Sequence, residues 1–382
     1  MYIPRLLEPK LRERLKSDPN KVIVVYGARQ TGKTTLLKKV VAEFDDIQWF
    51  DGDESDVRAL FARMSSAYFR SLFKPGSIVV IDEAQNIPEI GRSLKVIFDH
   101  LPDVRLIVSG SSSLDLAGSV NEPLTGRKVE YLLYPLAFEE MVRFHGLFEE
   151  QRRLEQRMIY GYYPGIVTAP LQDTIIFLKE LTGSYLYKDI LNWNKIRKPD
   201  KLVRLLQALA LQTGQQVSYH ELGEMTGLDN ETVESYIDLL EKSFVIYRLM
   251  PFSRNLRNEL KRTRKIYFYD TGIRNALINN FNPLDLRQDR GMLWENFLIT
   301  ERLKYLSYHD IHVNRYFWRT HNGQEIDYIE ERNGEFYVYE FTWSPRKKKK
   351  IPTVFLQNYP VREAKIIHKD NYIEFIMPEI SS

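Results

Sequence analysis

The 382-residue chain contains no cysteine, which excludes disulfide bonds, zinc–thiolate sites and catalytic thiols. Its seven histidines show no metal-ligand spacing such as H-x-x-x-H. No apolar stretch approaches the roughly 20 residues that a membrane-spanning helix needs, and the first residues lack the pattern of a signal peptide. We therefore expect a cytoplasmic protein that makes no contact with a membrane.

A strong excess of one charge is also lacking. The 54 Lys and Arg residues stand against 51 Asp and Glu residues, so the net charge is only +3. That value does not by itself indicate nucleic-acid binding, and local clusters carry more information. With 43% hydrophobic residues, the length and composition predict a globular chain of two or three domains.

The most informative stretch that is present has the pattern G-x-x-x-x-G-K-T, and it consists of Gly27, Ala28, Arg29, Gln30, Thr31, Gly32, Lys33 and Thr34. An apolar strand pattern (22–26) precedes it and a helical pattern (35–41) follows, so its backbone N–H groups and the helix N-terminus are expected to bind phosphate. Lys33 can reach the β- and γ-phosphates, the Thr34 hydroxyl can bind Mg²⁺, and Thr35 completes the expected nucleotide-binding residues. ATP and Mg²⁺ are the expected cofactors.

A second apolar strand pattern (77–81) ends in Asp82 and Glu83. Ligands of open α/β sheets bind at the carboxyl ends of the strands, so both acids are expected beside the phosphates. Asp82 is placed to hold the Mg²⁺ shell, and Glu83 is placed to polarise the attacking water. The pair favours hydrolysis over transfer of the phosphate to another acceptor.

Two further positions are candidates for contact with the γ-phosphate. Ser109 or Ser111 follows the strand pattern at 105–109 and either senses the γ-phosphate through its hydroxyl or caps the next helix. Arg127 either acts as an arginine finger, on its own nucleotide or on a neighbour's, or forms a structural ion pair.

The order of these patterns predicts the fold class. Strands and helices alternate from residue 1 to about 145, which predicts an α/β, doubly wound parallel sheet of five strands. The Asp82–Glu83 pair further predicts a strand inserted between the strand before Gly27 and the strand before Asp82. We assign residues 1–145 to a P-loop ATPase core and residues 146–198 to a helical lid.

Residues 199–265 predict a winged helix-turn-helix domain with a basic tail. Its third helix has an acidic solvent face, with Glu231, Glu234, Asp238 and Glu241, which DNA phosphates would repel. We therefore expect this module to contact a protein partner or another domain. The basic segment 254–265 either meets nucleic acid or is a solvated loop.

Residues 266–382 predict an α+β domain with one helix and several strands. Glu295, Asp327 and Glu340 follow the order of the acids in the restriction-endonuclease fold, where acids hold Mg²⁺ and a lysine stabilises the attacking hydroxide. Thr342 stands at the lysine position, which argues against an active nuclease. The basic run 346–350 either supplies a displaced lysine or binds a phosphate backbone without cutting, and the fold is otherwise retained for packing or binding.

Nearly the full length resembles the prokaryotic AAA-type P-loop ATPases, related to the signal-transducing STAND group, that carry a C-terminal endonuclease-like domain of unknown function. The matching stretches are 3–5, 27–35, 82–85, 109–112, 126–127, 135–140, 267–272, 325–328 and 340–342. The resemblance implies an ATP-binding core, a winged-helix middle and a nuclease-like end, and family members often have a lysine where this chain has Thr342.

Two functions remain open. The first is an ATP-driven switch, alone or as an oligomer, in which the nucleotide state controls partner binding through the later domains. The alternative is an ATP-dependent DNA-binding protein or nuclease, which depends on the basic segments and the C-terminal acids.

Overall fold

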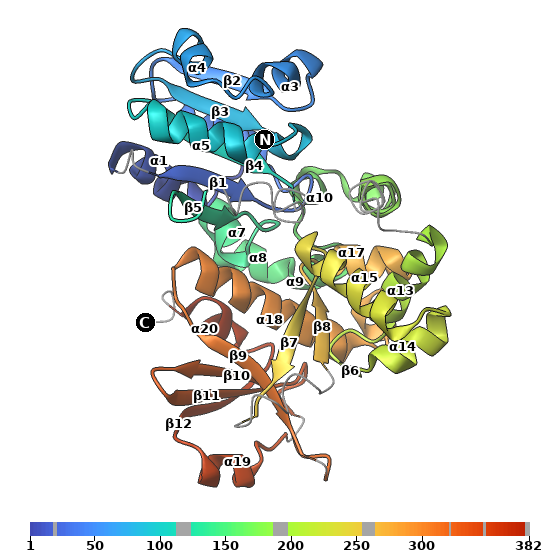
Figure 1. Cartoon of the computed structure of the whole chain (residues 1–382). Coiled ribbons are helices and arrows are strands. Elements are labelled where there is room, and N and C mark those ends of the chain that lie inside the picture. Colours follow the sequence, from blue (N-terminus) through green and yellow to red (C-terminus); the bar gives the residue numbers. More distant parts are fainter. Residues whose placement is uncertain are drawn as a thin grey trace. The chain divides into compact units, whose positions relative to one another are not determined.

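The computed structural model describes residues 1–17, 21–111, 124–185, 198–253, 264–320, 322–346 and 349–378. They form two compact units (Figure 1). Unit 1 comprises residues 1–136 with 242–244, and unit 2 comprises residues 137–241 with 245–382. No helix within the described ranges is both long enough and apolar enough to cross a bilayer.

Unit 1 contains a parallel sheet of five strands in the order β2-β3-β4-β1-β5. The strands are β1 (Val22–Tyr26), β2 (Ile47–Asp51), β3 (Ile78–Asp82), β4 (Arg105–Gly110) and β5 (Lys128–Leu132). The predicted doubly wound α/β class is confirmed, and so is the inserted strand, because β4 lies between β1 and β3. Both β1 and β3 are buried along their whole length, as their continuous aliphatic sequences predict.

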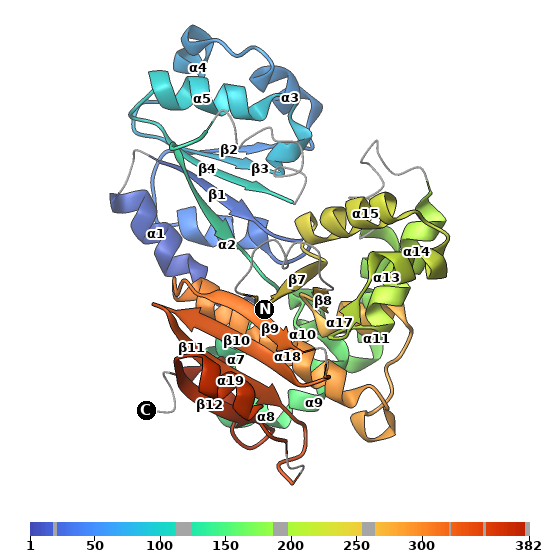
Figure 2. The same cartoon turned by 60° about the horizontal axis from the view of Figure 1, so that its bottom comes forward.

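Helices cover both faces of this sheet (Figure 2). One face carries α1 (Leu7–Ser17) and α2 (Lys33–Val41); the other carries α3 (Ser55–Phe61), α4 (Ser66–Leu72) and α5 (Ile90–His100). A short 3-10 turn, η1 (Ala84–Asn86), follows β3. Alternation along β1 sends Val22 and Val24 to the α3–α5 side, where they join a core with Phe61 and Leu94.

Unit 2 contains a mixed sheet of seven strands in the order β12-β11-β10-β9-β7-β8-β6. The strands are β6 (Gln216–Val217), β7 (Ile246–Pro251), β8 (Arg264–Phe268), β9 (Asn314–Arg319), β10 (Glu325–Arg332), β11 (Glu335–Phe341) and β12 (Val361–Ile367). Parallel pairing of β7 with β9 joins the two halves of the sheet. The domain boundaries from the sequence remain a proposal, and the one expected between residues 265 and 266 falls inside β8.

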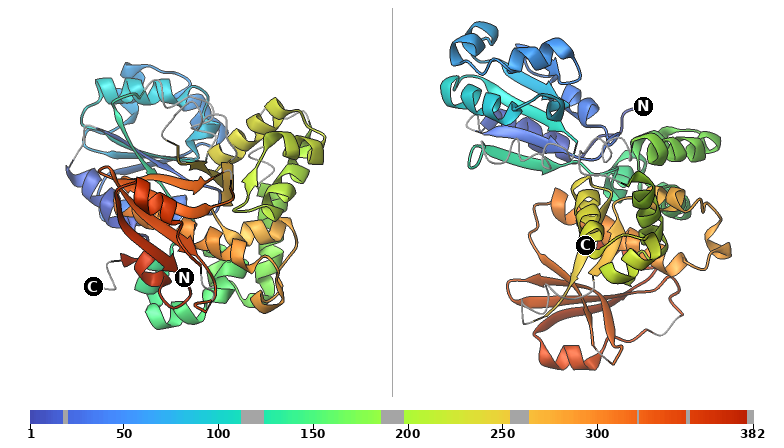
Figure 3. Two further views of the ribbon diagram at one scale, coloured as in Figure 1. Left: turned by 90° about the horizontal axis from the view of Figure 1, so that it is seen from below. Right: turned by 45° about the vertical axis from the view of Figure 1, so that its right-hand side comes forward.

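The helices of unit 2 fall into three sets. The first set comprises α7 (Phe138–His145), α8 (Leu147–Arg152), α9 (Leu154–Tyr160), α10 (Pro164–Thr168), α11 (Leu171–Glu180) and the π turn η2 (Leu181–Tyr185). The second comprises α13 (Pro199–Leu211), α14 (Tyr219–Thr226) and α15 (Asn230–Lys242). The third comprises α17 (Thr271–Leu277), η3 (Leu284–Leu286), α18 (Arg290–Tyr308), α19 (Thr353–Asn358) and α20 (Tyr372–Ile376). In Figure 3, the yellow-green helices α13–α15 and the dark red α19 lie at opposite ends of this unit.

Helix α18 is buried on nearly all sides and packs against one face of the sheet. The Asn296 amide accepts from Phe268 N at 2.9 Å and donates to Phe268 O at 2.8 Å, so it pairs with the backbone of β8. At the other half of the sheet, the Arg302 guanidinium forms a bidentate pair with Glu330 on β10. These paired polar groups fix how the helix crosses the sheet.

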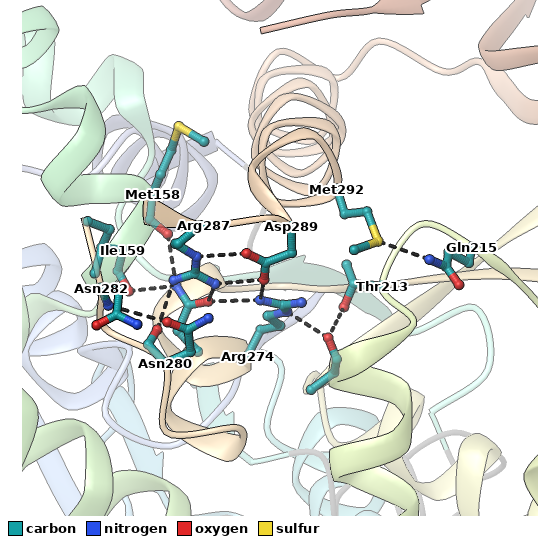
Figure 4. A network of polar contacts seen from close by, with 12 residues as sticks. Met158, Ile159, Thr213, Gln215, Arg274, Asn280, Asn282, Arg287, Asp289 and Met292 are labelled. Atoms are coloured by element: carbon teal, nitrogen blue, oxygen red, sulfur yellow. Dashed lines mark hydrogen bonds and ion pairs between the residues drawn. The ribbon is translucent and has the colours of Figure 1, made fainter. Parts of the chain in front are cut away.

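A buried polar network joins the helices of this unit (Figure 4). The Asp289 carboxylate, just before α18, pairs with Arg274 on α17 and with Arg287. Asn275 donates to the carbonyls of Met158 and Ile159 at the end of α9. Although burial opposes ionisation, the hydrogen bonds and charges of the two arginines hold the pKa of Asp289 well below its usual value.

Candidate nucleotide-binding site

The P-loop connects β1 to α2, as the sequence predicts. Gly27 is required by close packing, because a Cβ there would lie 2.3 Å from the carbonyl oxygen of Leu133. Gly32 has φ 94° and serves as the N-cap of α2, a conformation that glycine adopts without strain. Together the two glycines let the loop curl between the strand end and the helix N-terminus, the geometry that binds phosphate.

The side chains of Lys33 and Thr31 donate hydrogen bonds to the backbone of this loop. The buried Lys33 ammonium donates to the carbonyls of Gly27 at 2.9 Å and Ala28 at 3.0 Å. The Thr31 hydroxyl donates to Ala28 O at 2.8 Å. The ammonium therefore lies over the P-loop backbone, whereas Thr34 is half-buried and Thr35 is exposed in the first turn of α2.

Arg5 is a member of this site to which the sequence alone assigned no role. Its guanidinium donates to Thr31 O at 2.7 Å and to Tyr134 O at 2.6 Å, and the residue is 5% exposed. The only available signal was the stretch 3–5, which matched the family pattern without indicating a contact. Arg5 ties the N-terminal segment to the P-loop and to the chain after β5.

Asp82, Glu83 and Ser109 lie at the same edge of the sheet as the P-loop. Parallel registers pair Tyr26 with Gly110 and Ile81 with Val108, so the carboxyl ends of β1, β4 and β3 are level. The buried Ser109 hydroxyl donates to Asp82 Oδ1, and Glu83 N donates to the same oxygen at 3.2 Å. Ser109 is thus held between the P-loop strand and the acidic pair.

The position of Glu83 is set by its backbone conformation and by two neighbours, Gln85 and Gly52. It has φ 46° and is the N-cap residue of η1, directly after β3 ends at Asp82. The Gln85 amide donates to Glu83 Oε2 at 2.5 Å. Gly52, after β2, donates its N–H to Asp82 O at 2.9 Å, and a Cβ there would lie 2.4 Å from Glu83 O. No sequence signal predicted a role for Gly52 or Gln85.

The residues present fit a magnesium ion coordinated mainly by phosphate. Both side-chain hydrogen bonds described for Asp82 end on Oδ1, and the Thr34 hydroxyl lies in the adjoining first turn of α2. Over the described ranges, no group of three or more acids or histidines is arranged to hold a metal by itself. Magnesium in phosphoryl-transfer sites takes one or two protein ligands and completes its shell with phosphate and water.

The interpretation of Arg127 as a finger for its own nucleotide is wrong for this arrangement. Arg127 O accepts from Val22 N at the start of β1, so the residue lies at the amino edge of the sheet. The five-residue β1 separates that edge from the P-loop by about 15 Å. The guanidinium instead pairs with Asp99 at 2.9 Å, as the alternative of a structural ion pair proposed. Action on a neighbour's nucleotide stays a prediction.

A second cluster gathers in unit 2. Glu295 on α18, Asp327 on β10 and Glu340 on β11 are joined by two lysines. Lys349 belongs to the run 346–350, for which a displaced lysine was one alternative, whereas Lys265 was not expected here. Lys265 Nζ on β8 lies 3.1 Å from Glu295 and 3.9 Å from Asp327. Lys349 Nζ lies 2.5 Å from Asp327 Oδ2 and 2.8 Å from Glu340 Oε2.

Burial raises the pKa values of the three acids in this cluster, whereas the charges of the two lysines lower them. Burial raises the pKa of Glu340 to about 7, and the charge of Asp327 adds to that rise. Burial raises the pKa of Glu295 as well. For Asp327, the charges of Lys265 and Lys349 outweigh burial and lower the pKa. Glu340 Oε1 is buried and has no hydrogen-bond partner among the residues that the structure describes.

The structure changes the interpretation of the basic segment 254–265 and describes only part of the run 346–350. The buried Lys265 is 2% exposed and also pairs with Glu325 at 2.7 Å, so its inclusion in a nucleic-acid surface at 254–265 is wrong. Residues 254–263, 347 and 348 lie outside the described residues. Arg248 on β7 pairs with Asp238 and Glu241 of the acidic helix α15, so two of the four acids of the predicted face have a cationic partner, and Glu231 and Glu234 are exposed.

Comparison with known families finds a match that covers most of unit 1. Residues 19–142 match the family described as an AAA domain. Residues 151–284 and 290–375 match two domains of unknown function, DUF8612 and DUF4143. The chain therefore contains an AAA domain, followed by two segments that match families of unknown function.

The relatives are bacterial and archaeal. An uncharacterized protein of Mycobacterium tuberculosis is 27% identical over 338 residues, which cover 87% of this chain and 72% of that protein. One from Methanocaldococcus jannaschii is 26% identical, covering 98% of this chain and 94% of its own length. Among solved structures, the Walker-type ATPase of Pyrococcus abyssi matches with 17% identity and a TM-score of 0.49, covering 72% of this chain and 96% of that one.

Proposed function

We propose that this protein binds ATP with Mg²⁺ at the P-loop, hydrolyses it, and uses the nucleotide state to control a partner through unit 2. One observation carries the hydrolytic part. Asp82 and Glu83 end β3 at the edge where the P-loop ends β1, and Ser109 on the intervening β4 is bonded to Asp82. This arrangement supports Asp82 as a cation ligand and Glu83 as a general base beside the phosphate-binding loop.

The roles follow from the chemistry of each group. Backbone N–H groups of the P-loop and the start of α2 bind the β-phosphate, and Lys33 neutralises charge on the β- and γ-phosphates. Thr34 and Asp82 hold Mg²⁺, which withdraws charge from the phosphate oxygens. Glu83 accepts the proton of the attacking water, and Ser109 keeps Asp82 oriented through Oδ1.

Phosphate release by the purified chain tests the hydrolytic part. Lys33→Ala is expected to abolish ATP binding, whereas Glu83→Gln is expected to retain bound ATP and lose at least about 100-fold in turnover. Lys95 and Glu54 are exposed residues of the same unit, so Lys95→Ala and Glu54→Gln are matched controls. A purified sample that binds no ATP would contradict the proposal.

The switch part requires that unit 2 respond to the nucleotide. Light scattering on the Glu83→Gln variant, with ATP and then with ADP, separates a monomer from a dimer or a ring. Limited proteolysis under the same conditions reports changes in exposure along residues 137–378. Identical mass and identical cleavage in both nucleotide states would remove the switch.

A second candidate function is phosphodiester cleavage in unit 2, supported by the position of Lys349. Its ammonium lies between Asp327 and Glu340, which supports Lys349 as a substitute for the lysine that Thr342 replaces. Thr342 itself donates to Ser344 O at 3.2 Å. The unpartnered Glu340 Oε1 is suited to a divalent cation.

Plasmid incubated with Mg²⁺ or Mn²⁺ tests this candidate directly. Nicking that is lost in both Asp327→Ala and Lys349→Ala, but kept in Lys33→Ala, would assign cleavage to unit 2. No nicking by the wild-type chain under either metal would reject it, and the cluster would then be a buried ion-pair network that stabilises the sheet.

A further inference from the structure

We infer that Gln85 is a positioning residue, which orients the Glu83 carboxylate and ties it to the end of β4. The inference rests on the proposed hydrolysis for its catalytic consequence, although the tie itself is independent of any nucleotide. It gives a role to the last residue of the stretch 82–85, which the acidic pair alone does not explain.

The Gln85 carboxamide bridges two neighbours. Gln85 Nε2 donates to Glu83 Oε2 at 2.5 Å, and Gln85 Oε1 accepts from Ser111 N at 3.2 Å. The first contact lies at the end of β3 and the second follows the end of β4. A carboxamide carries a donor at one end and an acceptor at the other, so a single glutamine side chain can satisfy both neighbours.

The backbone makes this bridge possible. Glu83 has φ 46° and starts η1, and the turn is closed by Asn86 N donating to Glu83 O at 3.0 Å. The turn returns the side chain of Gln85 toward that of Glu83, two residues earlier. Ala84, between them, is fully buried and anchors the turn in the core of unit 1.

As a consequence, side-chain hydrogen bonds join the ends of β3 and β4 at the edge of the site. Ser109 bonds to Asp82, and Ser111 reaches Glu83 through Gln85. Because Gln85 occupies Glu83 Oε2, the other carboxylate oxygen, Oε1, is the one that accepts the proton of water. A shift of the chain after β4 would therefore move the general base, and this links the serine segment to the rate of hydrolysis.

Two variants separate the parts of the bridge. Gln85→Met keeps the length of the side chain and loses both hydrogen bonds. Gln85→Glu keeps an acceptor for Ser111 N and loses the donor to Glu83. Asn86→Ala is the control, since Asn86 lies in the same turn and its amide bonds only to the exposed Asp53 among the contacts described.

Steady-state and single-turnover hydrolysis test the catalytic consequence. Both Gln85 variants are expected to lower kcat by about 10- to 100-fold, with the Kd for ATP changed by less than about threefold and with Tm close to wild type. An unchanged kcat in Gln85→Met, with an active wild type, would overturn the role in catalysis. A purely structural role would instead lower Tm and leave kcat unchanged.

Amide hydrogen exchange at Ser111, measured without nucleotide, tests the bridge apart from hydrolysis. Exchange is expected to accelerate in Gln85→Met and to stay slow in Gln85→Glu. Equal exchange in the wild type and in Gln85→Met would refute the bridge. If the wild type fails to hydrolyse ATP while the exchange pattern holds, the proposed function fails and the bridge stands, but its role in catalysis is withdrawn.

Discussion

Arg5 Nη1 donates a 2.7 Å hydrogen bond to the carbonyl oxygen of Thr31 in the P-loop, across 26 residues of sequence. The other end of the same planar fork reaches Tyr134 O at 2.6 Å. A lysine presents a single ammonium and cannot reproduce this fork, so the contact requires arginine at this position. The N-terminal segment therefore helps to hold the loop in the shape that binds phosphate.

We predict that Arg5→Lys and Arg5→Ala weaken ATP binding by about 10-fold, because each leaves a buried loop carbonyl without its donor. Titration with a fluorescent ATP analogue measures the change. Arg92→Ala removes an exposed arginine of the same unit, whose partner is Glu89, and serves as the control. Wild-type affinity in Arg5→Ala would show that the loop keeps its shape alone.

Ser109→Ala should raise the Mg²⁺ concentration needed for half-maximal hydrolysis by about 10-fold, because Asp82 Oδ1 loses its hydroxyl donor. Ser93 supplies a matched control: it is also buried, and its hydroxyl donates to Phe61 O at 2.7 Å, away from the site. Ser93→Ala should lower stability by about 1 kcal/mol and leave the Mg²⁺ dependence unchanged. The same dependence in both variants would contradict the role of Ser109.

Gly52→Ala is expected to lower stability by about 1–3 kcal/mol and to reduce hydrolysis. The added Cβ would lie 2.4 Å from Glu83 O, so the end of β2 or the backbone of Glu83 must move. Gly291→Ala is the control, because a Cβ at that helical position meets no atom within 4 Å. Urea unfolding and phosphate release measure the two effects, and full activity in Gly52→Ala would show that Glu83 tolerates displacement.

Asp289→Asn is expected to lower stability at neutral pH by about 3 kcal/mol, since it leaves two buried arginines without their carboxylate. The folded pKa of Asp289 lies below its unfolded value of about 3.8. Its contribution is therefore complete above about pH 4 and is lost as the pH falls toward the folded pKa.

Urea unfolding of both proteins at pH 7, 4 and 3 measures this contribution. The difference in unfolding free energy between wild type and variant should shrink between pH 4 and 3. The exposed Asp285, four residues earlier, provides the control Asp285→Asn. A difference that is constant with pH would show that Asp289 does not act through its charge.

Lys349→Ala should lower stability by about 1–3 kcal/mol, because Asp327 and Glu340 lose a shared ammonium. Lys350 is the exposed neighbour, so Lys350→Ala is expected to leave stability within about 0.5 kcal/mol of wild type. Thermal unfolding compares the two, and equal Tm values would mean that the pairing of Lys349 contributes nothing to the fold.

The features that the sequence predicted correctly are those whose signal lies within a few consecutive residues. The P-loop, the apolar strands of unit 1 and the strand inserted between β1 and β3 followed from runs of a few residues each. Arg127 failed as a cis finger because its position depended on which end of β5 it occupies. Lys265 failed as a surface cation because burial beside Glu295 depends on β8 pairing within the larger sheet.

The sequence by itself determined the P-loop and the acidic pair after β3, because each depends on a few consecutive residues at the end of one apolar strand. Only the tertiary structure decided which distant groups meet there, namely Arg5 on Thr31, Ser109 on Asp82, and Gln85 between Glu83 and Ser111. It also decided that Lys349 pairs with both Asp327 and Glu340. Such contacts join residues whose separation along the chain does not indicate their distance in space. The packing of strands and helices determines which of these residues meet.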